Sequence, residues 1–181
     1  GCGGSTGSPE SGASSAPSGS VSNFKPCAVS DLTGFDDKDF NQLTLEGVKA
    51  AAAQVGVEAR GAEPASEDQY EGSINALIDD GCDFIVTVGF ALANATRDAA
   101  QADPAVEFAL IDSVVADDDF NTITLENVKP VMFDTAQAAA LAGYLAAGAS
   151  TTGIVGTYGG LPFPTVTVFM DGFADGVAKY N

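Results

Sequence analysis

Residues 25–62 read KPCAVSDLTGFDDKDFNQLTLEGVKAAAAQVGVEARGA, and this stretch decides the fold class. It begins with an apolar run over residues 25–31, continues into an amphipathic pattern over 37–55, and returns to a short apolar run over 57–62. Apolar residues spaced three and four apart indicate a helix, whereas short runs rich in β-branched residues indicate strands. The stretch therefore predicts a strand, a helix and a second strand, the unit from which parallel sheets are built.

The same alternation continues along the chain. Residues 84–88 are apolar and β-branched without alternation, as expected of a central parallel strand that is covered on both faces. The other predicted elements are helices over 67–80, 92–101, 134–147 and 165–180, and strands over 106–111, 121–128 (an edge strand) and 153–158. This order predicts an α/β fold with a right-handed, doubly wound parallel sheet. In such sheets, ligands bind beyond the carboxyl ends of the strands.

The composition excludes several classes of function. The 181 residues include 25 Asp and Glu against 7 Lys and Arg, and the formal net charge of −18 disfavours binding to nucleic acid and to anionic membrane surfaces. The absence of histidine removes imidazole-based catalysis and His-ligated zinc. The 3 cysteines have no C-x-x-C spacing, and no apolar run approaches the length of a membrane span. We therefore expect neither a metal nor a cofactor.

Residues 1–23 differ in composition from the rest of the chain. They are rich in Gly, Ser and Pro, which predicts a flexible linker because such a segment cannot bury enough apolar surface to fold. Cys2 stands directly before this linker, as in a bacterial lipoprotein whose signal peptide is removed just ahead of a lipidated cysteine. We therefore expect a lipid anchor on Cys2 and an extracytoplasmic location at the cell membrane. The alternative is a cloning remnant followed by a disordered tail.

Cys27 and Cys82 would then lie in an oxidising compartment. Each stands at the start of an apolar stretch, so neighbouring parallel strands would place both cysteines at the same edge of the sheet. We expect them to form a disulfide, which would close a loop of about 55 residues and stabilise the fold by about 4 kcal/mol. The alternative is a pair of buried free thiols.

The densest polar cluster is residues 31–41, DLTGFDDKDFN, between the first predicted strand and the first predicted helix. Asp31, at the carboxyl end of the strand, suits the acceptance of hydrogen bonds from two neighbouring hydroxyls. Phe35 or Phe40 offers a flat face on which a ring can stack. Asn41 can donate and accept at the edge of a sugar or a heterocycle.

Two other interpretations of this cluster stay open. As the start of a capped helix, it would use Asp36 or Asp37 as the N-cap and place Phe40 in the core. As an enzyme site, Asp36, Asp37 and Asp39 could bind Ca²⁺ or Mg²⁺ through oxygen, as a nucleoside hydrolase-like reaction would need. Lys38 lies inside this run, however, and no second acidic cluster is placed to complete a metal site. We therefore expect no enzyme.

An eleven-residue pattern occurs twice in the chain. Residues 39–49 and 119–129 share eight identities, beginning with Asp-Phe-Asn in both copies. A true repeat would extend into its flanks and keep its structure. The flanks differ, and the first copy predicts a helix whereas the second predicts a strand, so coincidence is the favoured explanation.

Several stretches of the chain resemble a known family. They are VSDLTGFDDKDFNQLTLEGVKAA (29–51), CDFIVTVGFALANAT (82–96), FALID (108–112), QAAALAGYLAA (137–147) and GGLPFPTVTVFMDGFADG (159–176). They resemble the basic membrane protein (PnrA-like) family of ABC-transporter solute-binding lipoproteins, whose known members bind nucleosides. The resemblance covers nearly everything after Asn23, and the composition is similar to an actinobacterial branch.

This resemblance implies a type I periplasmic-binding fold, in which two α/β lobes close around a ligand at a hinge. Residues 24–131 would form the first lobe, and residues 132–181 would begin a second lobe that the much longer family members complete. The protein would capture a small polar solute, a nucleoside in the first place, for an ABC permease and its ATPase, with no catalytic step. A lipoprotein that senses its ligand for a membrane signalling partner is the alternative.

The same resemblance implies roles for individual residues. Asp31 would hold ribose hydroxyls, Phe40 would stack on the base and Asn41 would support the edge of the base. Asp112 would be a second hydroxyl acceptor from the first lobe. Close backbone approach and the remaining pocket walls would come from Gly89, Phe90 and residues 159–164.

Overall fold

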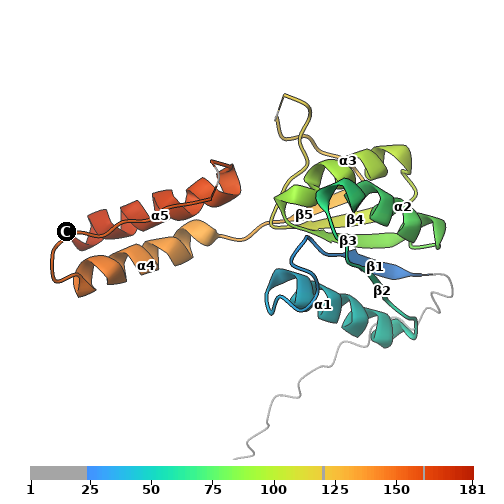
Figure 1. Ribbon diagram of the computed structural model, residues 1–181, viewed down its shortest axis with the longest axis horizontal. Coiled ribbons are helices and arrows are strands. Elements are labelled where there is room, and N and C mark those ends of the chain that lie inside the picture. Colours follow the sequence, from blue (N-terminus) through green and yellow to red (C-terminus); the bar gives the residue numbers. More distant parts are fainter. Residues whose placement is uncertain (1–23, 120, 161) are drawn as a thin grey trace, which may run out of the picture.

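The computed structural model describes residues 24–119, 121–160 and 162–181. A five-stranded parallel sheet with the strand order β2-β1-β3-β4-β5 forms its centre (Figure 1). The strands are β1 (Pro26–Val29), β2 (Arg60–Ala62), β3 (Phe84–Val88), β4 (Glu107–Ile111) and β5 (Val128–Val131). The predicted α/β fold with a parallel sheet is therefore confirmed. The predicted linker, with the lipidation expected on Cys2, lies outside the described residues.

Helices cover both faces of this sheet, as a doubly wound fold requires (Figure 1). One face carries α1, and the opposite face carries α2 and α3, each of which follows a short 3₁₀ turn. The bounds are α1 (Phe40–Val55), η1 (Glu67–Gln69), α2 (Tyr70–Asp79), η2 (Phe90–Leu92) and α3 (Ala93–Ala102). These bounds lie within three residues of the predicted helices, and β2 begins three residues later than expected.

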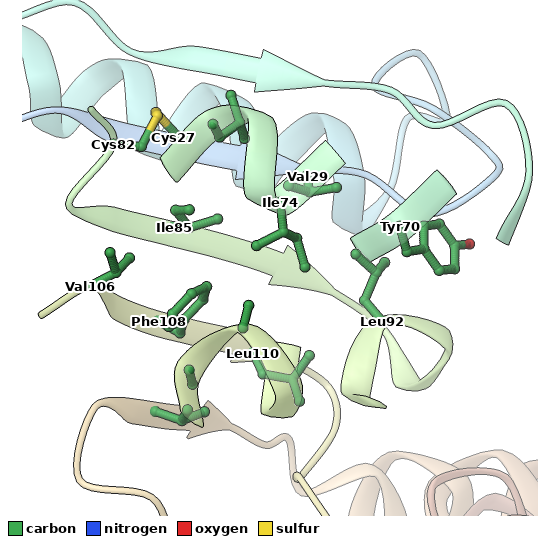
Figure 2. Close-up of a cluster of buried hydrophobic side chains, with 14 of the residues drawn as sticks. Cys27, Val29, Tyr70, Ile74, Cys82, Ile85, Leu92, Val106, Phe108 and Leu110 are labelled. Atoms are coloured by element: carbon green, nitrogen blue, oxygen red, sulfur yellow. A yellow bond between two sulfur atoms is a disulfide. The ribbon is translucent and has the colours of Figure 1, made fainter. Parts of the chain in front are cut away.

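The larger hydrophobic core lies between the sheet and α2 and α3. It gathers Ile74 from α2, Ile85 from β3 and Phe108 from β4, which are all at most 1% exposed (Figure 2). The strands alternate, so neighbouring residues such as Ala28 and Val86 point to the other face and pack against α1 in a smaller cluster. Each central strand is therefore buried on both sides, which explains its continuous apolar sequence.

The face beneath α1 is less completely covered than the other face. An apolar groove of about 280 Å³ runs between α1 and the sheet and is bordered by Phe24, Leu43, Phe84 and Ile111. Leu43 on α1 is 63% exposed as a result. The sheet thus has one fully packed face and one that a single helix covers in part.

A disulfide joins Cys27 in β1 to Cys82 in the turn before β3 (Figure 2). The two strands are neighbours in the sheet, with Cys27 opposite Ile85, and the two cysteine Cα atoms are 6.0 Å apart. Both side chains are at most 2% exposed and belong to the larger core. The structure therefore contains the cross-link that the spacing of the two apolar stretches indicated.

The predicted edge strand over 121–128 is wrong in its position. The edge strand is β5, which pairs Val128 with Phe108 and Pro130 with Leu110, whereas the residues before it form a loop. Ile123 and Leu125 alternate with polar residues because they pack from this loop onto the larger core. Pro130 is tolerated in β5 because an edge strand pairs on one side alone.

Helices α4 (Thr135–Ala149) and α5 (Pro164–Tyr180) form a pair that projects away from the sheet (Figure 1). They run parallel, because Gly172 faces Ala136 and Gly176 faces Ala140. The two backbones touch at these positions. A Cβ on Gly172 would lie 2.5 Å from the Ala136 oxygen, and a Cβ on Gly176 would lie 1.9 Å from the Ala140 oxygen.

The predicted strand over 153–158 is absent from the described structure. This segment leads from the end of α4 back to the start of α5, as a strand between two parallel helices would, but no strand pairs with it. Ile154 and Tyr158 are accordingly 80% and 94% exposed. A strand needs a neighbour to satisfy its backbone N–H and C=O groups, so the apolar pattern alone does not produce one.

Candidate functional site

The loop after β1 is organised around one oxygen of Asp31. Asp31 Oδ1 accepts hydrogen bonds from the backbone N–H of Thr33 (2.8 Å), from the Thr33 hydroxyl (2.5 Å) and from the Asn41 amide (3.0 Å). Asp31 Oδ2 accepts no hydrogen bond from the described residues, and the side chain is half-buried. One oxygen of this carboxylate therefore holds the loop, while the other stays available to a ligand.

Asn41 lies within the hydrogen-bond network of this loop. The side chain is 2% exposed, its Oδ1 accepts the backbone N–H of Asp31, and its Nδ2 lies within 3.0 Å of oxygens of Asp31, Thr33 and Asp37. These bonds do not test the expectation that Asn41 supports the edge of a base, and that role stays a prediction. Asn41 positions Asp31 with these bonds, and its Oδ1, which accepts one of them, keeps a second lone pair.

Asp37 caps the first helix from two residues before the N-cap position. Its carboxylate accepts the backbone N–H groups of Asp39 (3.0 Å), Asn41 (3.1 Å) and Gln42 (2.9 Å), whereas Asp39 makes no side-chain cap bond. Desolvation acts to raise the pKa of Asp37, but these bonds and the Asn41 amide outweigh it and lower the pKa to about 2. The Asp37 side chain thus caps the helix, but the N-cap position is Asp39 instead of Asp36 or Asp37, and Phe40 is exposed instead of lying in the core.

Helix α1 begins three residues later than predicted because Asp37 lies outside the helix and binds its first backbone N–H groups. Lys38 adopts a left-handed backbone with φ of 61°, which no residue inside a right-handed helix can have. The Asp37 side chain replaces the first helical hydrogen bonds, so the regular helix starts at Phe40.

Gly89 and Asp112 follow the two central strands with unusual backbones. Gly89, after β3, has φ of 84°, and a Cβ placed on it would lie 3.8 Å from Asp31 Oδ2. Asp112, after β4, has φ of 55°, which is costly for a residue other than glycine. Its backbone N–H donates to the Val131 carbonyl (2.8 Å), which ties the end of β4 to the end of β5.

The carboxylate of Asp112 makes no hydrogen bond to the described residues. Burial raises its pKa, since the charged form loses solvent without gaining a partner in the protein. Asp31, Gly89 and Asp112 therefore lie at the carboxyl ends of three adjacent strands, where a doubly wound sheet binds ligands. Together they offer two acceptor groups and a place where a ligand can approach the backbone.

The two phenylalanines of the loop have different environments. Phe35 packs against the smaller core, and a Cβ on Gly61 would lie 2.8 Å from its ring. Phe35 is therefore half-buried against this cluster, and its expected role as a stacking surface stays a prediction. Phe40, the first residue of α1, is 38% exposed and is the ring of the pair that remains open to a ligand.

Two aromatic pairs join the sheet to the chain that follows it. The rings of Phe40 and Phe133 have centroids 5.4 Å apart, and those of Phe90 and Phe163 have centroids 5.2 Å apart. Phe133 follows β5, and Phe163 is the residue before α5. Phe163 lies within residues 159–164, which the family resemblance places in the pocket wall. Phe133 was not expected at a carboxyl end, because the predicted edge strand ends at Val128.

An aspartate two residues before each copy of the repeated pattern makes similar hydrogen bonds. Asp117 accepts the backbone N–H groups of Asp119 (3.0 Å) and Asn121 (2.8 Å), as Asp37 does before the first copy. No helix follows Asp117, and the chain continues as a loop. The carboxylate bonds are therefore a property of the short motif, whereas the helix depends on the residues that follow it.

Metal binding finds no support in the part of the chain that the structure describes. No group of three or more His, Cys, Asp or Glu side chains is arranged to hold a metal ion in residues 24–119, 121–160 and 162–181. The carboxylate of Asp37, which the metal interpretation would need, is already engaged by the start of α1.

The family of the chain follows from its sequence. The family described as "ABC transporter substrate-binding protein PnrA-like" matches residues 24–181. The chain belongs to this family. PnrA-like proteins bind substrates for ABC transporters and are not enzymes.

Curated relatives resemble this chain in sequence, and a solved structure resembles it in fold. Basic membrane protein A of Borreliella burgdorferi is 33% identical over 146 residues, which are 81% of this chain and 41% of that protein. The "ABC transporter nucleoside-binding protein BmpA" of Lactococcus lactis is 30% identical over 168 residues, 90% of this chain and 46% of that protein. An ABC transporter solute-binding protein from Aeropyrum pernix superposes with a TM-score of 0.71 at 26% identity, covering 87% of this chain and 44% of that one. The chain thus spans less than half the length of each.

None of the helices described is both long enough and apolar enough to cross a membrane.

Proposed function

We propose that the protein captures a nucleoside outside the cytoplasm and delivers it to an ABC permease and its ATPase. The proposal rests on one observation: the two carboxylate oxygens of Asp31 have different surroundings. Its Oδ1 accepts three hydrogen bonds from the loop, and its Oδ2 faces Gly89 without a partner among the described residues. A charged acceptor that is held in place and left available suits the hydroxyls of a sugar.

The surrounding residues supply the other features that a nucleoside needs. Asp112 would accept a second hydroxyl, since its carboxylate has no protein partner described. Phe40 would stack on the base with its exposed ring. The Lactococcus relative, which is named a nucleoside-binding protein, supports this choice of ligand.

The arrangement of the chain supports a two-lobe mechanism. In this proposal residues 24–131 form the first lobe, the α4–α5 pair begins the second, and the ligand stabilises the closed arrangement of the two. The proposal also includes a lipid anchor on Cys2, which would keep the protein at the membrane surface near the permease. The work is binding alone, so affinity is the quantity to measure.

The experiment is a calorimetric titration of the full-length gene product with purine nucleosides, pyrimidine nucleosides and free ribose. Asp31→Asn keeps an oxygen for the loop and replaces the free carboxylate oxygen, so we expect affinity to fall at least tenfold, about 1.4 kcal/mol. Glu63→Gln is the matched control, because that carboxylate follows β2 but already binds the backbone N–H of Phe35 (2.7 Å). The proposal fails if the unaltered protein binds no nucleoside, and Asp31 leaves the site if Asp31→Asn binds normally.

A further inference from the structure

The backbone N–H groups of the short loop that carries Asp31 are nearly all paired close by. The Asp31 N–H donates to the Asn41 side chain (3.0 Å). The Thr33 N–H donates to the Asp31 carboxylate (2.8 Å), and the Gly34 N–H donates to the Asp31 carbonyl (3.2 Å). The remaining N–H is that of Leu32, directly after Asp31, and it has no partner within the loop as the structure describes it. A group that accepts this N–H would help to fix the direction of the carboxylate.

Tyr70, the first residue of α2, brings a hydroxyl to this loop. The residue is 3% exposed, and its ring belongs to the larger core. Figure 2 shows the ring at one end of this core, with the hydroxyl pointing away from Ile74. A buried tyrosine hydroxyl needs a hydrogen-bond partner, so the groups around it are informative.

The pKa of Tyr70 reports which groups surround the hydroxyl. Burial raises the pKa of Tyr70, the negative charges of Asp31 and Glu67 raise it further, and the backbone N–H of Leu32 lowers it. An N–H lowers the pKa of a phenol when it points at the oxygen and favours the charged form. The Tyr70 oxygen therefore faces the Leu32 N–H and lies near the Asp31 carboxylate.

We propose that Tyr70 is a positioning residue for ligand capture: its hydroxyl holds the loop at Leu32 and thereby sets the direction of the free Asp31 oxygen. This inference rests on the proposed function, since it assigns a supporting residue to the same nucleoside site. Because Tyr70 is almost fully buried, its effect on a ligand passes through the loop and not through a contact of its own.

The loop is held from both faces of the sheet. Asn41 belongs to α1 on one face, whereas Tyr70 belongs to α2 on the opposite face (Figure 1). A carboxylate that is fixed before the ligand arrives loses little conformational freedom on binding, which favours affinity. Removing the hold on one face should therefore weaken binding although every ligand contact is still present.

The test is a double-mutant cycle in the full-length gene product, titrated with purine and pyrimidine nucleosides by calorimetry. Tyr70→Phe keeps the ring in the core and removes the hydroxyl, so nucleoside affinity should fall about three- to tenfold. In the Asp31→Asn background the same change should cost less than about twofold, because the oxygen that Tyr70 positions is already gone. Unchanged affinity in Tyr70→Phe overturns the inference, and so does an equal loss in both backgrounds.

Hydrogen exchange of the Leu32 amide tests the contact itself without a ligand. In protein labelled with ¹⁵N-leucine, Tyr70→Phe should speed the exchange of this amide, because its acceptor is removed. An unchanged rate overturns the inference. If the unaltered protein binds no nucleoside, the proposed function fails, and the Leu32 amide still decides whether Tyr70 holds the loop.

Thr96→Val is the matched control for the loss of a buried hydroxyl. Thr96, on α3, is 0% exposed, and its hydroxyl shares a hydrogen bond of 2.8 Å with that of Thr87 in β3. This variant should lower the thermal unfolding midpoint, because the Thr87 hydroxyl is left unpaired, and keep nucleoside affinity within about twofold. A loss of affinity as large as that of Tyr70→Phe would show that destabilisation alone weakens binding, which overturns the role of Tyr70.

Discussion

The sheet and the α4–α5 pair are stabilised in different ways. The sheet buries large side chains such as Ile74 and Phe108 between layers and carries a disulfide within its core. The helical pair instead brings two backbones into contact at Gly172 and Gly176, while Leu141 and Leu145 are 74% and 71% exposed. The sheet thus completes most of its core from its own residues, whereas the helical pair leaves apolar side chains uncovered.

The disulfide should have the largest effect on the sheet. Replacing both cysteines (Cys27→Ala with Cys82→Ala) removes a cross-link over 55 residues and should lower the free energy of unfolding by about 4 kcal/mol, because the unfolded chain gains entropy. Urea unfolding of the 181-residue chain measures this change. Reductant should lower the urea midpoint of the unaltered protein and leave that of the variant unchanged. Alkylation of Cys27 and Cys82 in the unreduced protein would contradict the cross-link.

The backbone contact of the helical pair should give the next largest effect. Gly176→Ala places a Cβ 1.9 Å from the Ala140 oxygen and should destabilise the pair by about 1–3 kcal/mol, although alanine favours helices. Hydrogen exchange of the α4 and α5 amides measures the change.

Gly72→Ala is the control for that variant. A Cβ on Gly72 in α2 meets nothing within 4 Å, so this change should stabilise by about 0.5–1 kcal/mol through helix propensity. The comparison is informative because Gly176→Ala should destabilise the protein, whereas Gly72→Ala should stabilise it. Slower exchange of α4 and α5 in Gly176→Ala would disprove the close approach.

Replacing the aspartate that precedes each copy of the repeated pattern should have a smaller effect on stability. Asp37→Ala removes the cap of α1 and should cost about 1 kcal/mol. Asp117→Ala removes the same kind of bonds to backbone N–H groups where no helix follows, so it should cost less. Thermal unfolding measures the loss of stability in each variant. Equal losses would show that capping a helix adds nothing to the stabilisation that such a carboxylate provides.

The pH dependence of the same carboxylate should be the smallest effect. The pKa of Asp37 is about 2 in the folded protein, below the value of 3.8 for a free side chain. A lowered pKa means that the stabilisation is present above about pH 4 and is lost as the pH falls towards 2. The stability difference between the unaltered protein and Asp37→Asn should therefore shrink over this range. A difference that stays constant from pH 5 to about pH 2 would refute the assignment.

The sheet could be predicted from sequence because each of its strands carries its own pattern. Residues 84–88 show the continuous apolar run of a buried strand, and β3 occupies these residues. The elements that were misplaced depend on distant partners. Ile123 and Leu125 alternate like a strand but pack onto the core from a loop, and residues 153–158 have no neighbouring strand. Periodicity reports which residues are apolar and not which partner satisfies the backbone.

The candidate site could be predicted in outline for a similar reason. The positions of Asp31, Gly89 and Asp112 follow from the rule that parallel strands end at one edge. The loop bonds of Asn41 and the packing of Phe35 could not be predicted. The sequence is the same whether the Asn holds the loop or the Phe packs against the sheet, or whether each contacts a ligand. Which side chain remains free depends on hydrogen bonds that spacing does not report.

The position of the disulfide along the chain bears on how the protein is made. The five strands of the described residues and the two cysteines of the disulfide lie between Pro26 and Val131, so each pairing of this sheet can form while later residues are still being synthesised. Oxidation of Cys27 and Cys82 would then lock this part before the α4–α5 pair follows.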